Sequence, residues 1–264
     1  MSGKPLPLPK LGHALIDRVQ AFFYPIFWFA KDPGALTKQM QQVSEQVDQA
    51  VHFADNFFTW GRNNSMFDDR AFVAAWDGNA ENHTDRAIVW RRYVLACAAY
   101  HCVHLDGDFV ECGCYAGVGV KTVVDYLGGV AFPKDFWIYD LFEHDDSMLH
   151  HSLPEHGPEL ETKVRKKFET YKQVKICKGF IPTVFAGQSP EAIAYLHIDL
   201  NQAPAEIAAL EALFDRVVPG GIVVLDDYEW SAYRAQKIAE DEWFDARQYR
   251  VIPLPTGQGI VIKR

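Results

Sequence analysis

From residue 107 onward, short apolar runs alternate with longer amphipathic segments. Five runs are nearly continuous in apolar residues, as expected for strands buried on both faces: DFVECG, DFWIYDLF, VKICKG, AIAYLHIDL and GGIVVLDDY. The segments between them have helical spacing, and the C-terminal YRVIPLPTGQGIVIKR predicts two strands joined by a turn. The pattern predicts an α/β fold with a doubly wound, mostly parallel, seven-stranded sheet, helices on both faces and an antiparallel C-terminal hairpin strand.

Residues 1–80 follow a different pattern. The stretch ALTKQMQQVSEQVDQAVHFADNFF, residues 35–58, has apolar positions near helical spacing, and residues 61–82 are polar and rich in turn formers. We therefore expect residues 1–80 to form a helical N-terminal extension and residues 81–264 to form the main domain. A further helix is predicted over about 84–104, where TDRAIVWRRYVLACAAYHCVH follows a candidate cap.

The composition favours a soluble cytoplasmic protein that acts on small molecules. The chain has 264 residues, of which 48% are hydrophobic, and a net charge of -9, which argues against a nucleic-acid partner. We expect no signal peptide, and the most apolar stretch, AFFYPIFWFA at 21–30, is too short to span a bilayer. That stretch is expected to pack on the main domain or on a second subunit, with contact to a membrane surface as the weaker alternative.

A glycine-rich loop follows the first predicted strand of the main domain. The stretch FVECGCYAGVGV contains Glu111, Gly113 and Gly117 but has Tyr115 where the dinucleotide fingerprint requires glycine. An acidic residue two positions before the first glycine suits an ammonium or sulfonium ligand better than a pyrophosphate. The next strand ends in Asp140, whose carboxylate could accept hydrogen bonds from ribose hydroxyls. The alternative is a tight turn with a solvated acid.

Three aspartates are expected to meet at one edge of the sheet. Asp199 ends the fourth predicted strand, and Asp226 and Asp227 end the fifth. Two such charges about 4 Å apart repel by roughly 4 kcal/mol at an effective dielectric near 20, and a divalent cation would remove that conflict. Carboxylate oxygens suit octahedral Mg²⁺. The alternatives are that Asp227 caps the following helix or that one aspartate pairs with Arg234.

These motifs resemble those of class I S-adenosylmethionine-dependent methyltransferases. GDFVECGCYAGVGV with FWIYDLFE, and the HID and DDY strand ends, look most like the macrocin O-methyltransferase (TylF-like) family over residues 84–264. The resemblance implies a Rossmann-like fold, S-adenosylmethionine as methyl donor, and Mg²⁺ held by Asp199, Asp226 and Asp227. One departure is Asn201, where the family often has a second acid. It borders the acceptor, so the substrate could differ from the family's macrolide sugars.

The resemblance also implies site roles. It predicts methyl transfer to a hydroxyl of a sugar or glycosylated metabolite, with His144 or Asp199 as the base. His144 could equally be a solvated loop residue, and His150, His151 and His156 share its loop. Residues 141–162 are expected to form a lid. The expected cofactor contacts are Glu111, Gly113, Tyr115, Gly117, Asp140, Phe142, Gly179 and Phe180.

Three other functions stay open at this point. A catechol-type O-methyltransferase would use similar metal chemistry on vicinal phenolic hydroxyls. A nicotinamide-dependent oxidoreductase is disfavoured by the missing glycine at position 115 and by the leading Glu111. A protein that binds S-adenosylmethionine without catalysis is the third. The N-terminal helices could form a homo-oligomer and complete the acceptor site of a neighbouring subunit.

Overall fold

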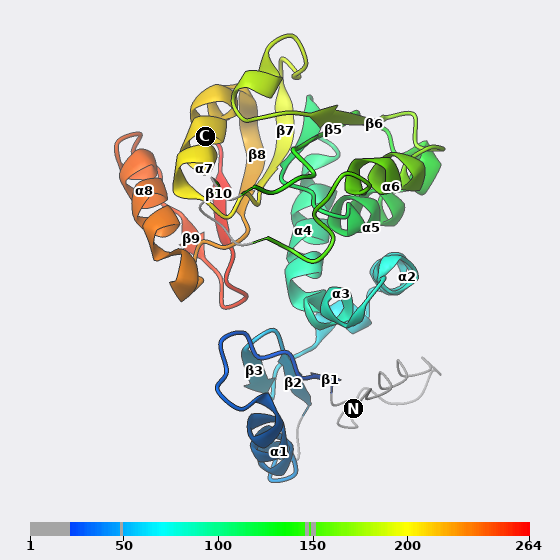
Figure 1. Ribbon diagram of the computed structural model, residues 1–264, viewed down its shortest axis with the longest axis vertical. Coiled ribbons are helices and arrows are strands. Elements are labelled where there is room, and N and C mark those ends of the chain that lie inside the picture. The colour runs from blue at the N-terminus through cyan, green and yellow to red at the C-terminus, as the bar shows by residue number, and fades with distance from the viewer. Residues whose placement is uncertain (1–21, 48–49, 146–147, 149–151) are drawn as a thin grey trace. The chain divides into compact units, whose positions relative to one another are not determined.

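The computed structural model describes residues 22–47, 50–145, 148 and 152–264, which divide into two compact units (Figure 1). The boundary between the units lies between Trp90 and Arg91, whereas the sequence placed a domain boundary after residue 80. We call residues 22–90 the N-terminal unit and residues 91–264 the C-terminal unit. Each unit is described by itself below.

The N-terminal unit combines helices with a small sheet. Its strands β1 (Phe22–Tyr24), β2 (Val51–Ala54) and β3 (Phe57–Trp60) are paired in that order, β1 parallel to β2 and β2 antiparallel to β3. Its helices are α1 (Pro33–Ser44), α2 (Arg70–Asn79) and α3 (His83–Ala87).

The predicted helix over 35–58 is therefore correct only for its first part. Helix α1 ends at Ser44, and residues 51–60 form a β-hairpin instead. Asp55 and Asn56 make its two-residue turn with φ of 54° and 55°. Asp and Asn tolerate this left-handed conformation, and a turn of this kind matches the twist of paired strands. Aromatic residues in VHFA and FFTW favour strands on either side of the turn.

The C-terminal unit contains the predicted sheet. Its strands are β4 (Asp108–Cys112), β5 (Phe136–Asp140), β6 (Val174–Lys178), β7 (Ile193–Ile198), β8 (Val217–Leu225), β9 (Ile252–Pro253) and β10 (Gly259–Ile262). In the described residues they form one sheet with the order β6-β5-β4-β7-β8-β10-β9. The first five strands are parallel, and β10 is antiparallel to both of its neighbours. The predicted doubly wound α/β sheet with its C-terminal hairpin is confirmed.

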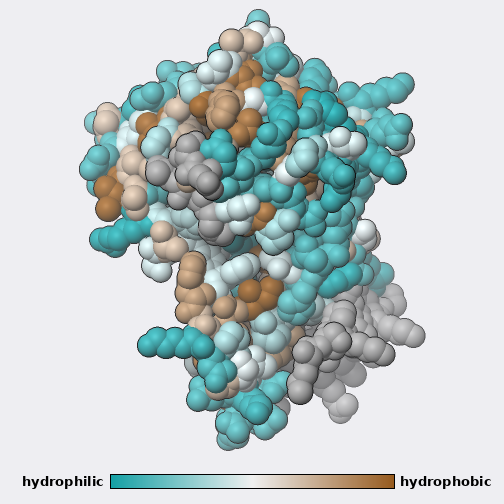
Figure 2. All heavy atoms as spheres, in the orientation of Figure 1, coloured by the Kyte–Doolittle hydropathy of each residue, from teal (hydrophilic) through white to brown (hydrophobic). Residues whose placement is uncertain are grey.

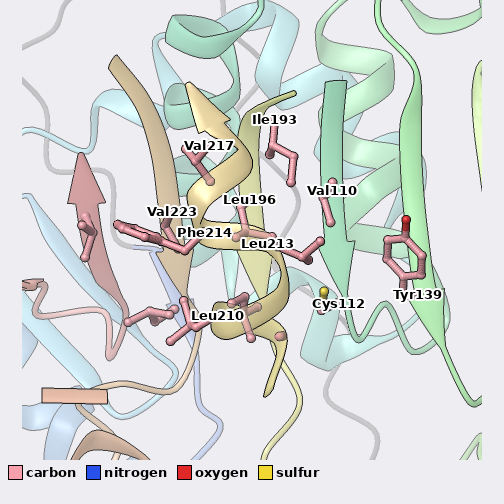
Figure 3. Close-up of a cluster of buried hydrophobic side chains, with 14 of the residues drawn as sticks. Val110, Cys112, Tyr139, Ile193, Leu196, Leu210, Leu213, Phe214, Val217 and Val223 are labelled. Atoms are coloured by element: carbon pink, nitrogen blue, oxygen red, sulfur yellow. The ribbon is translucent and has the colours of Figure 1, made fainter. Parts of the chain in front are cut away.

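Helices cover both faces of this sheet (Figure 1). Helices α7 (Ala203–Leu213) and α8 (Arg234–Asp245) pack on one face, where Leu210 and Leu213 meet Leu196 and Val223 (Figure 3). Helices α4 (Val89–Cys102), α5 (Val118–Tyr126) and α6 (Leu160–Lys167) cover the other face, around Phe109 and Tyr195. Because side chains alternate along a strand, each parallel strand contributes to both cores.

The face seen in Figure 2 is mostly polar. Figure 2 shows hydrophilic side chains over most of one face, with hydrophobic residues in small groups. Among the described residues, no helix has both the length and the apolar character needed to cross a membrane.

Candidate functional site

A cavity of about 470 Å³ opens at the carboxyl ends of four parallel strands. It is lined by Gly113 after β4, Asp140 at the end of β5, Gly179 after β6 and Asp199 after β7. The chain builds β4, β5 and β6 outward in one direction and then returns to add β7 and β8 on the other side of β4. The cavity therefore lies at the topological switch point, where open α/β sheets bind ligands. Its volume is within the range of small-molecule sites.

Gly113 allows the ends of β4 and β7 to approach each other. Its φ is +87°, and a Cβ atom there would lie 1.9 Å from the backbone oxygen of Asp199. Its amide donates to the Tyr139 carbonyl at 2.8 Å, and the Asp199 amide donates to the Cys112 carbonyl at 2.8 Å. Glycine is therefore required here by the neighbouring backbone.

Asp140 holds the glycine-rich loop in place. Its Oδ2 accepts hydrogen bonds from the amides of Cys114 and Tyr115 at 2.7 and 2.8 Å, and its Oδ1 accepts from the amide of Phe142 at 2.6 Å. A carboxylate has about four acceptor positions. Within the described residues, the three backbone amides account for three of these positions.

Aromatic and imidazole rings form one wall of the cavity. Tyr115 and His156 both line it, with their rings edge to face at a centroid separation of 5.4 Å. The Tyr115 hydroxyl accepts from the amide of Glu155 at 2.8 Å. His144, the predicted base, stacks on His156 at 5.9 Å, and it is His156 that lines the cavity. His150 and His151 lie outside the described residues.

Three more predicted cofactor residues separate into rim and core positions. Phe180 lines the cavity and is 63% exposed. Phe142 is buried in the core beside α6. It contributes to the site through the hydrogen bond that its backbone amide donates to Asp140. Gly117 precedes α5 with φ of +73°, and a Cβ atom there would lie 3.0 Å from the Phe168 ring. Phe142 and Gly117 therefore shape the loop from behind, and the described cavity lining includes neither.

Glu111 lies on the α4 face of the sheet and is not among the described lining residues. It shares that face with Phe109, because strand residues alternate, and the sheet register aligns it with His197 of β7. Its Oε2 lies 3.0 Å from His197 Nδ1, and His197 Nε2 lies 3.4 Å from Asp226 Oδ1. Burial by itself would lower the pKa of His197, but the two flanking carboxylates raise it to about 10. The three side chains form a buried, charged row.

Arg91 joins this row to the paired aspartates. Its Nη2 donates to Asp226 Oδ2 and, at 2.8 Å, to Asp227 Oδ1. Gln258 Nε2 donates to Asp226 Oδ1 at 2.8 Å. Burial would raise the pKa of Asp226, but Arg91 and His197 hold it well below its usual range. The expected pairing of an aspartate with Arg234 is replaced by this contact with Arg91.

The predicted Mg²⁺ site does not fit these side chains. Arg91, Gln258 and His197 already occupy or face the oxygens of Asp226, and Arg91 also holds Asp227. Of the predicted metal ligands, Asp199 lines the cavity, and Asp226 and Asp227 are buried away from its described lining. The part of the chain that the structure describes contains no group of three or more His, Cys, Asp or Glu side chains arranged to hold a metal ion.

Of the three aspartates that were predicted to bind a metal, Asp199 is the one in the described lining of the cavity. Burial, together with the negative charges of Asp226 and Asp227, raises its pKa well above the usual value. The side-chain Nδ2 of Asn201 donates to Asp199 Oδ1 at 3.3 Å, so the residue that departs from the family pattern contacts this aspartate directly. A protonated Asp199 would donate a hydrogen bond to a bound oxygen and would not act as a base.

Arg91 is the site residue that the sequence analysis missed. It lies four residues before Leu95 and seven before Ala98, and both of those side chains are buried on the α4 face of the sheet. Arg91 therefore continues the apolar stripe of the helix, at a spacing where a hydrophobic residue is expected. A charged residue on a buried stripe signals a buried partner, although it does not say which one.

Comparisons with known proteins agree with this fold. Residues 94–252 match the family model described as Macrocin-O-methyltransferase (TylF). A curated relative is the 8-demethyl-8-(2,3-dimethoxy-alpha-L-rhamnosyl)-tetracenomycin-C 4'-O-methyltransferase of Streptomyces olivaceus, which is 30% identical over 148 residues. That match covers 49% of this chain and 56% of the relative, so the chain matches little more than half the relative's length.

Solved structures of methyltransferases share the fold. The O-methyltransferase NovP superposes with a TM-score of 0.59 and 18% identity, over 74% of this chain and 88% of that one. The Podospora anserina methyltransferase PaMTH1, solved with bound S-adenosylhomocysteine (SAH), gives a TM-score of 0.50 and 11% identity, over 90% and 100% of the two chains. The family model covers more than half of the chain, and the resemblance seen in the strand ends is confirmed: the chain belongs to the macrocin-O-methyltransferase (TylF) family.

Proposed function

We propose that this protein transfers a methyl group from S-adenosylmethionine to a hydroxyl of a sugar, either free or attached to a natural product. The observation that carries the proposal is the cavity at the switch point, whose lining includes both Gly113 of the glycine-rich loop and Asp140, the residue that holds this loop. Membership of an O-methyltransferase family supports the reaction. The rhamnosyl group in the name of the Streptomyces relative supports the sugar acceptor.

The cavity residues divide between the two ends of the donor. Asp140 keeps an acceptor position for a ribose hydroxyl, and Gly179 and the exposed ring of Phe180 form the rim where an adenine could stack. Tyr115 and Gly113 would border the methionine part of the donor. Asp199 and Asn201, on the β7 side, would face the acceptor.

The chemistry requires a good leaving group and a proton acceptor. S-adenosylmethionine supplies a methyl group on a sulfonium: its C–S bond breaks as the new C–O bond forms. The acceptor hydroxyl loses its proton in the same event, and we assign that proton to the stacked pair of His144 and His156, of which His156 lines the cavity. Protonated Asp199 would donate a hydrogen bond that orients the acceptor. No step uses a metal ion, since the paired aspartates do not fit one.

The catechol-type alternative loses its main support at this point. It depends on a cation that binds two neighbouring hydroxyls at once, and Arg91 holds the acids that would bind that cation. A sugar hydroxyl held by hydrogen bonds to Asp199 and Asn201 does not require a cation.

Binding measurements with matched variants test the proposal. S-adenosylmethionine and S-adenosylhomocysteine should each bind in calorimetry and raise the melting temperature of the whole chain. Phe180→Ala removes an exposed aromatic ring at the rim and should weaken donor binding by roughly 3- to 10-fold without loss of stability. Val130→Ala is the control, because Val130 is 66% exposed and does not line the cavity.

A methyl-transfer screen with labelled donor then tests the acceptor. Nucleotide sugars, glycosylated polyketides and catechols are compared under the same conditions, and the sugar-bearing compounds should be methylated. Stabilisation by NAD but by neither S-adenosyl compound would refute the proposal. Donor binding with no transfer to any sugar would instead favour the catechol or non-catalytic alternatives.

A further inference from the structure

We propose that Arg91 replaces a divalent cation at the paired aspartates, so that this chain folds and transfers methyl groups without a metal ion. The activity part of this inference rests on the proposed function. The binding part does not, because it concerns the affinity of the protein for Mg²⁺ alone.

The first argument is the position of Arg91 in the fold. Arg91, Leu95, Ala98 and Cys102 follow each other at helical spacing, and the last three are buried on the α4 face of the sheet. The Arg91 side chain is only 12% exposed, which is rare for arginine unless it has a partner. Both of its partner carboxylates stand at the end of β8.

The second argument is the number of oxygen atoms still open to a metal. Arg91 donates to Asp226 Oδ2, to the Asp226 carbonyl at 3.2 Å and to Asp227 Oδ1. Gln258 donates to Asp226 Oδ1, which also faces His197. Mg²⁺ requires about six oxygen ligands at close range and usually keeps several waters. The Asp226 and Asp227 carboxyl groups are buried, so binding Mg²⁺ would require Arg91 to leave.

The third argument is the charge of the buried row. The Arg91 guanidinium contacts both Asp226 and Asp227, and the His197 ring lies between Asp226 and Glu111, 3.4 and 3.0 Å from their carboxylate oxygens. Side chains of this chain therefore already face the carboxylates that a cation would have to neutralise. In this arrangement Arg91 is a positioning residue: it holds the end of β8 beside Asp199, and Asp199 reaches the cavity.

The test uses the full chain, freed of metal with a chelator. Calorimetry with MgCl₂ up to about 10 mM should give no saturable heat, and the melting temperature should stay unchanged, since a ligand stabilises only what it binds. Methyl transfer, once an acceptor is known, should be the same with chelator and with Mg²⁺. Saturable Mg²⁺ binding that Asp227→Asn abolishes would overturn the inference, and so would activity that requires Mg²⁺.

Substitutions at Arg91 test whether its positive charge takes the place of a divalent cation. Arg91→Met removes the charge but keeps the length, so the bare acids should now bind Mg²⁺ and the melting temperature should rise with it. Arg91→Lys should stay insensitive to Mg²⁺. Arg250→Met is the matched control, because Arg250 is 88% exposed and pairs with Asp245 on the surface. A folded Arg91→Met protein without any response to Mg²⁺ would refute the replacement.

The two proposals can fail separately. If Arg91→Met does not fold, the wild-type calorimetry still decides whether the protein binds Mg²⁺. If no acceptor is methylated although S-adenosylmethionine binds, the proposed function fails while the metal inference stands on the binding data.

Discussion

Two glutamates are buried between α7 and α8, and they should make the stability of the C-terminal unit depend on pH. Glu206 and Glu240 are both fully buried. The pKa of Glu206 is raised well above its usual value by burial and then by Glu240, and burial raises the pKa of Glu240 from 4.5 to about 7. The amide of Leu200 donates to Glu206 at 3.0 Å, which connects this pair to the loop that lines the cavity.

The sign follows from the protons bound in each state. Between pH 4.5 and about 7, Glu240 keeps its proton in the folded protein but loses it in the unfolded chain. The free energy of unfolding therefore falls as the pH rises through this window. The difference between a pKa of 4.5 and one of about 7 corresponds to about 3 kcal/mol of stability. Below pH 4.5 this contribution is constant.

Replacement of Glu240 by glutamine should remove the part of this pH dependence that comes from Glu240. Glu240→Gln cannot ionise, so it should stabilise the protein by about 2–3 kcal/mol at pH 8 and by little at pH 5. Urea unfolding at pH 5, 6, 7 and 8 measures the difference between the two proteins. Glu242→Gln, an exposed position on the same helix, should follow the wild type. Parallel curves for Glu240→Gln and the wild type across this range would refute the reasoning.

Three further substitutions test the Gly113 contact, the intrinsic stability of helix α2 and the buried His197 ion pairs. Gly113→Ala places a methyl group 1.9 Å from the Asp199 carbonyl, so it should lower the free energy of unfolding by roughly 1–3 kcal/mol and weaken donor binding; normal calorimetry would contradict this. Gly78→Ala, in helix α2 with nothing within 4 Å of the added methyl, should raise stability by about 0.5–1 kcal/mol in a melting experiment, and a loss would contradict it. Glu111→Gln leaves charged His197 with one carboxylate neighbour, so urea unfolding should show a loss of about 3 kcal/mol; a neutral result would mean that His197 is uncharged.

Local patterns in the sequence were enough to predict the sheet. Continuous apolar runs marked each parallel strand, and the helical segments between them required right-handed crossovers onto a sheet covered on both faces. Parallel strands have their carboxyl ends at the same edge of a sheet, so the acids and glycines at the strand ends could be assigned to that one edge. Gly113, Tyr115, Asp140, Gly179, Phe180 and Asp199 do line one cavity there.

The hairpin of the N-terminal unit was missed because two local signals compete there. Residues 35–44 do form a helix, and the helical spacing continues weakly into strand residues. The Asp55–Asn56 turn was the decisive signal, since it brings β2 and β3 together. Pairing between strands, which a spacing pattern within one segment does not contain, settled the structure of this segment.

The sequence by itself therefore determined the order of the elements, the edge of the sheet that carries the site, and six of the residues that line the cavity. Tertiary structure alone decided which charges meet. Glu111 turns to His197 because alternate strand residues face opposite cores, and Arg91 reaches Asp226, 135 positions away, because α4 packs on that same face. Coulomb energy depends on distance in space and on burial, so a pattern read along the chain identifies candidate charges but does not pair them.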